Sequence, residues 1–290
     1  MADWPVDYAS AALRSLTGGL RRRIARDVVA VFNDSSRGER PVRRAPDAIY
    51  SPASIVWKIH GDVGSMMIGG VSGLLLQMLH PAVLAGVWDH SNFRADMHGR
   101  LRRTARFIAL TTYGSRRDAE SAIARVRTIH ESVMGVLPGG AAYAASDPAL
   151  LAWVHVTEAL SFLGAWMRYG DPLLSLAQQD RYFDEFAEVA IALGADPAPR
   201  SRRAADLLVA DMRGQLKVDE RTKTVARLVL SQRPARGIPN PAAALILQAG
   251  VDLLPAWARR MHGFPSGPGR FAVRAGAYGM ARTVRWAFGS

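Results

Sequence analysis

Two guanidinium groups and a hydroxyl stand at helical spacing in the middle of the chain. Arg100, Arg103 and Thr104 occupy positions i, i+3 and i+4, so a helix would carry them on one face. The same stripe becomes apolar one turn later, at Phe107. Since Arg binds carboxylates through paired hydrogen bonds, this face suits an anionic group at the mouth of an apolar pocket. An arginine-rich solvated face is the alternative, and these residues alone favour that alternative.

Two histidines are candidate ligands. His130 falls on an apolar helical stripe with Ile123 and Val126, which predicts that its side chain points inward. An inward histidine is either a ligand or a core residue bonded to a carbonyl, and taken alone the second role is the commoner one. His155 stands three residues before Glu158, so on a helix the two can pair with each other instead of serving a ligand.

Several other kinds of chemistry are excluded or disfavoured. The chain has no Cys, which excludes disulfides, thiolate zinc sites, iron–sulfur clusters and a cysteine nucleophile. The phosphate-loop, dinucleotide, HExxH and GxSxG patterns are missing. No Glu is followed three residues later by His, which disfavours a ferritin-like di-iron site. A metal must therefore rest on histidines, carboxylates or a bound cofactor.

Helices must position these residues, because strand signals are nearly absent. Apolar residues recur with a helical period, and no Asn-Gly or Asp-Gly hairpin signal occurs. The sequence predicts an all-α fold, a single globular bundle of many helices. We expect helices over residues 9–33, 52–60, 64–79, 81–90, 98–113, 117–136, 147–169, 175–194, 202–215, 219–231, 240–262 and 270–287.

One uncharged segment, residues 63–88, is long enough to span a membrane. Four glycines interrupt its first half, and Pro81 lacks the amide that a continuous helix needs. We therefore predict two short buried helices that meet at His80-Pro81, and no transmembrane segment.

Residues 1–47 are expected to form an N-terminal helix and a polar arm, and residues 48–290 the main domain. The N-terminus has no apolar signal segment, which predicts a cytoplasmic protein. The formal charge is +12, but only three of the 37 basic residues are Lys, which indicates a compositional bias. The charge predicts no specific nucleic-acid binding and leaves peripheral contact with a membrane open.

Several spaced motifs resemble one known superfamily over roughly residues 50–260. It contains the rubber oxygenases (latex-clearing proteins), the MpaB-type oxygenases of the mycophenolate pathway, and a large bacterial branch of unknown function. The motifs that carry the resemblance are His80-Pro81, His90-Ser91-x-Phe93, Arg100-x-x-Arg103-Thr104, Val126-Arg-x-Ile-His130, and Ser146-x-Asp-Pro followed by Trp153-Val-His155.

The resemblance implies an α-helical, globin-like core that holds one haem b. By position, His130 corresponds to the proximal iron ligand, and neutral imidazole is an ordinary axial ligand of haem iron. The arginines and the threonine correspond to the family's Arg-x-x-(Lys/Arg)-Thr element, which lines the haem site. The residues expected to bind the cofactor are His130, Arg100, Arg103, Thr104, Phe107 and His155.

One departure from the family pattern concerns Arg103. Rubber-cleaving members carry Lys at this position, where it can lose its proton and bind iron, whereas Arg stays charged and is a poor ligand. The sixth iron position is then expected to hold water, to be open, or to be filled by His80 or His90. Residues 82–88 also lack the acid that rubber oxygenases use. An apolar substrate other than polyisoprene is therefore expected.

These features predict a haem-b-dependent oxygenase or oxidase that acts on a hydrophobic, isoprenoid- or lipid-like small molecule with dioxygen or peroxide. Arg100, Arg103 and Thr104 are the expected catalytic residues. A non-catalytic carrier of haem or of a hydrophobic ligand is the alternative, because fold similarity does not fix chemistry. A basic helical protein that binds nucleic acid or a membrane surface is supported only by charge.

Overall fold

The computed structural model describes residues 6–33, 38–232, 240–265 and 267–289. In these ranges the chain forms thirteen α-helices, one short 3-10 helix and one two-stranded hairpin. The elements are α1 (Val6–Phe32), α2 (Ile55–His60), α3 (Val63–Gln77), α4 (Pro81–His90), α5 (Met97–Tyr113), α6 (Arg116–Glu131), β1 (Met134–Val136), β2 (Ala142–Ala144), α7 (Pro148–Tyr169), α8 (Leu176–Leu193), α9 (Arg202–Met212), η2 (Arg213–Gln215), α10 (Glu220–Leu230), α11 (Asn240–Leu253), α12 (Ala256–His262) and α13 (Gly269–Phe288). The predicted all-α fold is confirmed.

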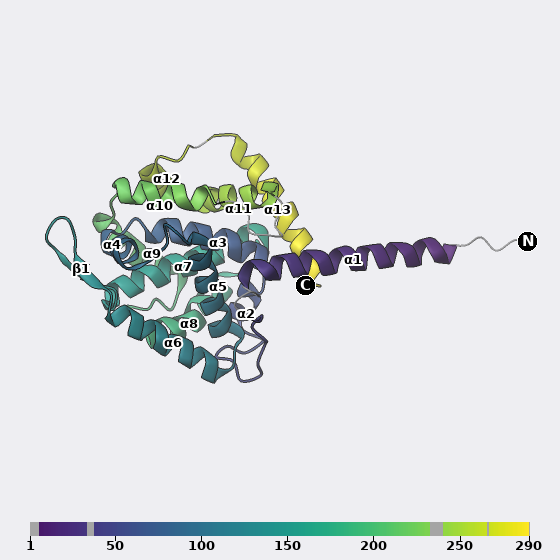
Figure 1. The fold of residues 1–290 in the computed structure, drawn as a ribbon, viewed down its shortest axis with the longest axis horizontal. Coiled ribbons are helices and arrows are strands. Elements are labelled where there is room, and N and C mark those ends of the chain that lie inside the picture. The colour runs from purple at the N-terminus through teal and green to yellow at the C-terminus, as the bar shows by residue number, and fades with distance from the viewer. Residues whose placement is uncertain (1–5, 34–37, 233–239, 266, 290) are drawn as a thin grey trace, which may run out of the picture.

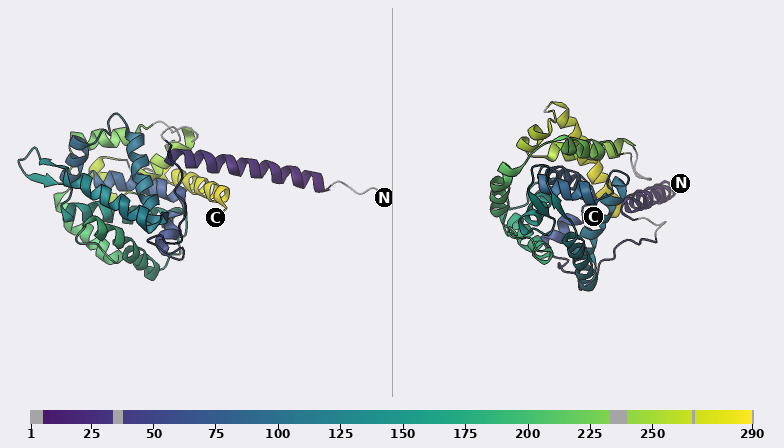
Figure 2. Two further views of the ribbon diagram at one scale, coloured as in Figure 1. Left: turned by 60° about the horizontal axis from the view of Figure 1, so that its bottom comes forward. Right: turned by 60° about the vertical axis from the view of Figure 1, so that its left-hand side comes forward.

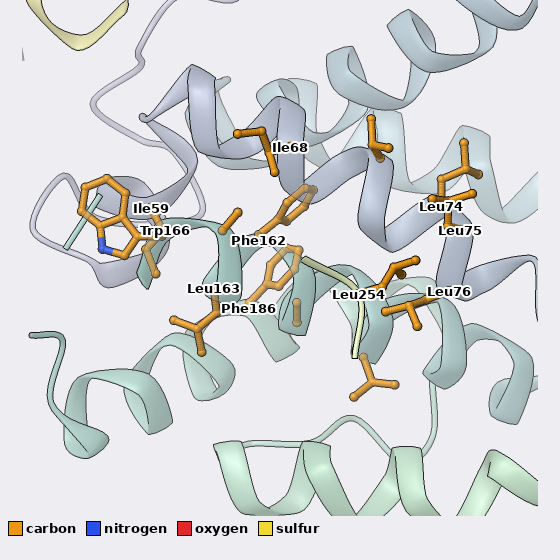
Figure 3. Packing of buried hydrophobic residues seen from close by; sticks show 14 of the residues in the cluster. Ile59, Ile68, Leu74, Leu75, Leu76, Phe162, Leu163, Trp166, Phe186 and Leu254 are labelled. Carbon is orange, nitrogen blue, oxygen red and sulfur yellow. The ribbon is translucent and has the colours of Figure 1, made fainter. Parts of the chain in front are cut away.

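Helices α3 and α7 form the centre of the bundle. They pack along each other, α11 and α13 cover α3, and α8 and α9 contact α7 (Figure 1). Gly69 of α3 makes the close approach possible, since a Cβ at this position would lie 2.8 Å from Cδ1 of Phe162. Figure 3 shows Phe162 between Ile68 of α3 and Phe186 of α8. The main apolar cluster of the core is thus built around α3 and α7, and two smaller clusters lie beside it.

The uncharged segment forms two helices with a bend between them, as predicted. α3 and α4 meet at His80-Pro81 with a bend of 104°. Pro81 is the first residue of α4, where its missing amide costs no helical hydrogen bond. By length and hydropathy alone, α7 also meets the criteria for a membrane span, and each of two bent pairs, α3 with α4 and α11 with α12, does so if counted as one span. In this fold 72% of the apolar window of α7 is buried inside the protein.

Two predicted helices differ from the structure by more than three residues at an end or by a break inside the helix. The helix predicted over 117–136 stops at Glu131 and is followed by a β-hairpin, in which Gly135 pairs with Tyr143. The hairpin was not predicted; it turns through Gly140, whose φ of +85° suits glycine. The helix predicted over 240–262 is broken before Pro255 into α11 and α12, which bend by 113°.

Helix α1 extends away from the bundle, and its C-terminal part lies beside α13 (Figures 1 and 2). Of the predicted polar arm, residues 34–37 lie outside the described ranges. The rest of the arm is hydrogen-bonded to α5: Ala45 N donates to Tyr113 O over 2.8 Å, and Arg106 Nη1 donates to Arg40 O over 2.8 Å. The division at residue 47 stays a prediction.

Candidate functional site

The N-terminus of α5 is fixed by Asp96. One oxygen of its carboxylate accepts the backbone N–H of Gly99 over 2.7 Å, and this bond is the main reason why the pKa of Asp96 is lowered. The other oxygen accepts Nη1 of Arg103 over 3.4 Å. The Arg103 side chain is 55% exposed and that of Asp96 41% exposed. Arg103 therefore lies at the surface in an ion pair of the kind that contributes little stability.

Arg100 lies in a different environment, although it is only three residues away. It is half-buried, and its Nη1 donates to Oγ of Ser91 over 3.1 Å. Burial, and then the neighbouring charge of Arg103, lower the pKa of Arg100. Among the described residues no carboxylate pairs with it. Such a cation has unused capacity to bind an anion.

The other two α5 candidates divide between surface and core. Thr104 is exposed, and its hydroxyl donates to the carbonyl oxygen of Arg100 over 3.2 Å. Phe107 is half-buried and packs against the main core cluster. The predicted stripe is therefore a helix face whose environment changes, with Arg100 and Phe107 inward and Arg103 and Thr104 outward.

His130 stands in the last turn of α6, which packs along α5. The side chain is half-buried, and its Nδ1 is buried without a hydrogen-bond partner. Neither ring nitrogen has a recorded hydrogen bond within the described part of the chain. Burial lowers the pKa of His130, which keeps the imidazole neutral near pH 7. An inward, neutral and unpartnered imidazole fits an axial ligand of haem iron.

His155 has similar properties on α7. It is buried, its Nε2 has no hydrogen-bond partner among the residues that the structure describes, and its ring centroid lies 4.8 Å from that of Phe186. Burial lowers the pKa of His155 to about 4 and raises that of Glu158 to about 7. No hydrogen bond or ion pair joins the two in the described structure, so their pairing, one of the sequence hypotheses, is not observed.

Three further histidines have hydrogen-bond partners, although Nδ1 of His80 is buried without one among the described residues. His60 contacts Thr112 Oγ1 at 2.9 Å and Tyr182 Oη at 3.2 Å, and burial lowers its pKa to about 3. Of the two suggested distal ligands, His80 bonds Gln215 Oε1 at 3.2 Å and His90 bonds the carbonyl of Met134 at 3.1 Å. His60 was not singled out in the sequence, because its partners come from α5 and α8.

The structure brings the candidates onto neighbouring helices of the bundle. No recorded hydrogen bond, ion pair or ring contact joins Arg100, His130 and His155 in the described ranges. α5 packs on α6, α6 on α8, and α8 on α7. Nor does any described group of three His, Asp or Glu side chains form a metal site. An iron atom here would therefore depend on a bound macrocycle for most of its ligands.

Comparison with known proteins gives one finding. The family model described as ER-bound oxygenase mpaB/B'/Rubber oxygenase, catalytic domain, matches residues 57–286. The matched range runs from α2 into α13 and includes every candidate residue above. Comparisons with curated proteins and with solved structures gave no match.

Proposed function

We propose that this chain, which belongs to the family of mpaB and rubber oxygenase catalytic domains, is a haem-b-dependent oxygenase that acts on a hydrophobic small molecule. The family assigns it to the oxygenases. The proposal adds the cofactor and the class of substrate. The observation that carries it is His130, a half-buried imidazole with an unpartnered ring nitrogen on the helix next to Arg100.

His130 would hold the iron of the cofactor. Burial keeps its imidazole unprotonated near pH 7, and only the unprotonated ring has a lone pair for a metal. Since no described group competes for its ring nitrogens, binding the iron would break no hydrogen bond. His155, with a buried unpartnered nitrogen and a pKa of about 4, is the second residue with these properties.

Arg100 would bind a haem propionate. Its guanidinium is half-buried, is held by the neutral hydroxyl of Ser91, and has no carboxylate partner among the described residues. A charge-assisted bond to a carboxylate would therefore add a counterion without displacing one. Phe107 would supply apolar wall, while Arg103 and Thr104 would stand at the solvent side of the site. Bound haem iron supplies the activation of dioxygen or peroxide.

The visible absorption spectrum tests the proposal. The protein, expressed with adequate iron, should show a Soret band with about one haem per chain. His130→Ala should lose the band, whereas His98→Ala, a change at an exposed histidine of α5, should retain it. A full, unchanged band in His130→Ala would reject this ligand, and the same measurement on His155→Ala would then show whether the second residue holds the iron.

Dioxygen consumption separates an oxygenase from a haem carrier. Haem-loaded protein supplied with a reductant and isoprenoid or acyl lipids should consume dioxygen above the rate of His130→Ala. If the haem-loaded protein consumes none with any of these lipids, the carrier function is favoured over the oxygenase.

A further inference from the structure

A hollow lies on the opposite side of α7 from His155. Its volume is about 320 Å³, and residues of α3, α7, α9, η2 and α12 line it. This volume falls at the lower end of the range of small-molecule pockets, which is roughly 300–1,000 Å³. The hollow is partly open to solvent, and three charged side chains, Arg202, Asp206 and Arg213, belong to its lining.

Helical spacing explains why the two regions are separate. Trp153, Thr157 and Leu160 of α7 line the hollow, as do Ser161 and Gly164, and successive members are one to four residues apart on one face. His155 and Phe162 fall about half a turn away from that face, and the ring of His155 lies against that of Phe186 of α8. Neither His130 nor Arg100 belongs to the lining, so the hollow is not part of the proposed haem site.

The inner wall of the hollow contains an unsatisfied hydroxyl. Ser161 is 4% exposed, and its Oγ has no hydrogen-bond partner within the described ranges of the chain. The hydroxyl of Thr157, one turn earlier, donates to the carbonyl of Trp153 over 2.8 Å and is therefore satisfied. Buried hydroxyls in proteins are almost always bonded, so an unbonded one that lines a hollow marks a place for a ligand oxygen.

The rim of the hollow has one spare positive charge. Arg202 and Asp206 of α9 neutralise each other across 3.0 Å. Arg213 lies above the ring of Trp257, with its guanidinium carbon 4.8 Å from the ring centroid. No carboxylate partner of Arg213 is recorded in the described ranges. Between rim and inner wall the lining is largely apolar, with Leu160, Val209 and Pro255.

We propose that this hollow binds a small aliphatic carboxylic acid that carries a second oxygen, a hydroxyl or a carbonyl, distant from the carboxylate. The carboxylate would bind Arg213, the chain would lie on Trp257 and the apolar wall, and the second oxygen would bond Ser161 Oγ. Arg213, which is charged, and Ser161, which is neutral, give the site its preference for a molecule that is polar at both ends.

Isothermal titration with matched acids tests this site. We expect 10-hydroxydecanoate to bind more tightly than decanoate, which lacks the second oxygen, and than methyl 10-hydroxydecanoate, which lacks the charge. Arg213→Ala should weaken binding of the hydroxy acid roughly ten- to hundredfold, which is the usual contribution of a charge-assisted hydrogen bond to affinity. Arg203→Ala, a change at an exposed residue of α9 outside the lining, should leave it unchanged.

Ser161→Ala provides the second test. It should reduce the affinity for 10-hydroxydecanoate to that for decanoate, while decanoate binds as before. Equal affinities of both acids for the unaltered protein, equal losses in Arg213→Ala and Arg203→Ala, or no measurable binding would each overturn the proposal. His130→Ala should still bind the hydroxy acid and should still prefer it to decanoate; a complete loss of binding there would place the acid in the haem site and also reject the proposal.

Discussion

Nη1 of Arg100 donates to Oγ of Ser91 across 3.1 Å, which ties the start of α5 to the residue that follows α4. A half-buried guanidinium is thus held by a neutral oxygen rather than by a carboxylate. Arg103, one turn further, uses the exposed carboxylate of Asp96 instead. Two arginines of the same motif therefore differ in whether a carboxylate already neutralises their charge, and this decides their capacity to bind another anion.

We expect Arg100→Ala to lower haem affinity roughly ten- to hundredfold, because the lost charge-assisted bond is worth about 1.5–3 kcal/mol. The helix itself should persist, since Ala is the best helix former. Haem titration of the apoprotein measures the change. Arg117→Ala, at an exposed position of α6, is the control and should titrate like the unaltered protein. Equal affinities of all three proteins would contradict a role of Arg100 in binding the cofactor.

Gly69 and Gly70 form a natural pair for testing the contact of α3 with α7. A Cβ at Gly69 would lie 2.8 Å from Phe162 Cδ1 and 2.9 Å from the carbonyl of Ser161, so Gly69→Ala should destabilise the protein by about 1–3 kcal/mol. A Cβ at Gly70 would meet nothing within 4 Å, so Gly70→Ala should stabilise it by about 0.5–1 kcal/mol. Urea unfolding of both variants measures the difference. Similar midpoints for the two would show that α3 and α7 are not in such close contact.

Glu158 should make stability depend on pH. Burial raises its pKa from 4.5 to about 7, so between these values the folded chain holds a proton that the unfolded chain has lost. Its contribution to stability is therefore greatest below pH 4.5 and is lost as pH rises through about 7. Glu158→Gln cannot ionise, so it should gain stability relative to the unaltered protein between pH 5 and pH 8. The lowered pKa values of buried His60 and His155 reduce the stability of the folded chain as pH falls below about 6.5. This loss is the same in both proteins, so it cancels in the comparison.

Urea unfolding at the two pH values measures this difference. Glu120→Gln, at an exposed position of α6, is the control and should show no such trend. A difference between Glu158→Gln and the unaltered protein that stays constant from pH 5 to pH 8 would mean that the Glu158 carboxyl is not buried.

Asp252 should be a major determinant of stability. Its carboxylate is 4% exposed and accepts Arg168 Nη1 over 3.2 Å, Arg274 Nε over 2.7 Å, and Nε of Arg270. Burial opposes its ionisation, yet the bonds from Arg274 and Arg270 outweigh burial and the pKa of Asp252 is lowered. Asp252→Asn would leave these guanidiniums without their common counterion, so we expect a loss of about 3–5 kcal/mol in urea unfolding.

Asp184 provides the matched control for Asp252. Its carboxylate is 58% exposed and pairs with Arg200 across 2.7 Å at the surface. Asp184→Asn should therefore cost less than about 1 kcal/mol. Comparable losses in the two variants would argue against a special role of the buried carboxylate.

The sequence was sufficient to predict most of the helices. The prediction failed where a few residues determine the path of the backbone, at the end of α6 and between α11 and α12. Helical periodicity and the missing amide of Pro81 correctly predicted α3, α4 and the bend between them. The same pattern extended the helix of His130 through residue 136, because strands of three residues, as in β1, are too short to show alternation. Pro255 was a visible helix-breaking signal, but the apolar period on both sides of it favoured one continuous helix.

The sequence predicted which helices carry the candidate residues, but it did not predict the contacts that these residues make. Positions i and i+3 share a helix face, yet one turn of α5 is enough to take Arg103 to solvent while Arg100 stays half-buried. Spacing along the chain also cannot show which groups find partners. Ser161 and Arg213 are far apart in sequence, and only the packing of α7 against α9 and α12 brings them to one hollow.

Helix α7 carries His155 on one face and Ser161 on another, so both residues belong to one helix. Any ligand that shifts this helix changes the surroundings of both residues at once. Thermodynamic linkage makes such an influence reciprocal: if an acid in the hollow strengthens the retention of a cofactor on the other side, the cofactor strengthens the retention of the acid by the same factor. Communication between the two regions would then need no hinge and no moving loop, only a displacement of one helix.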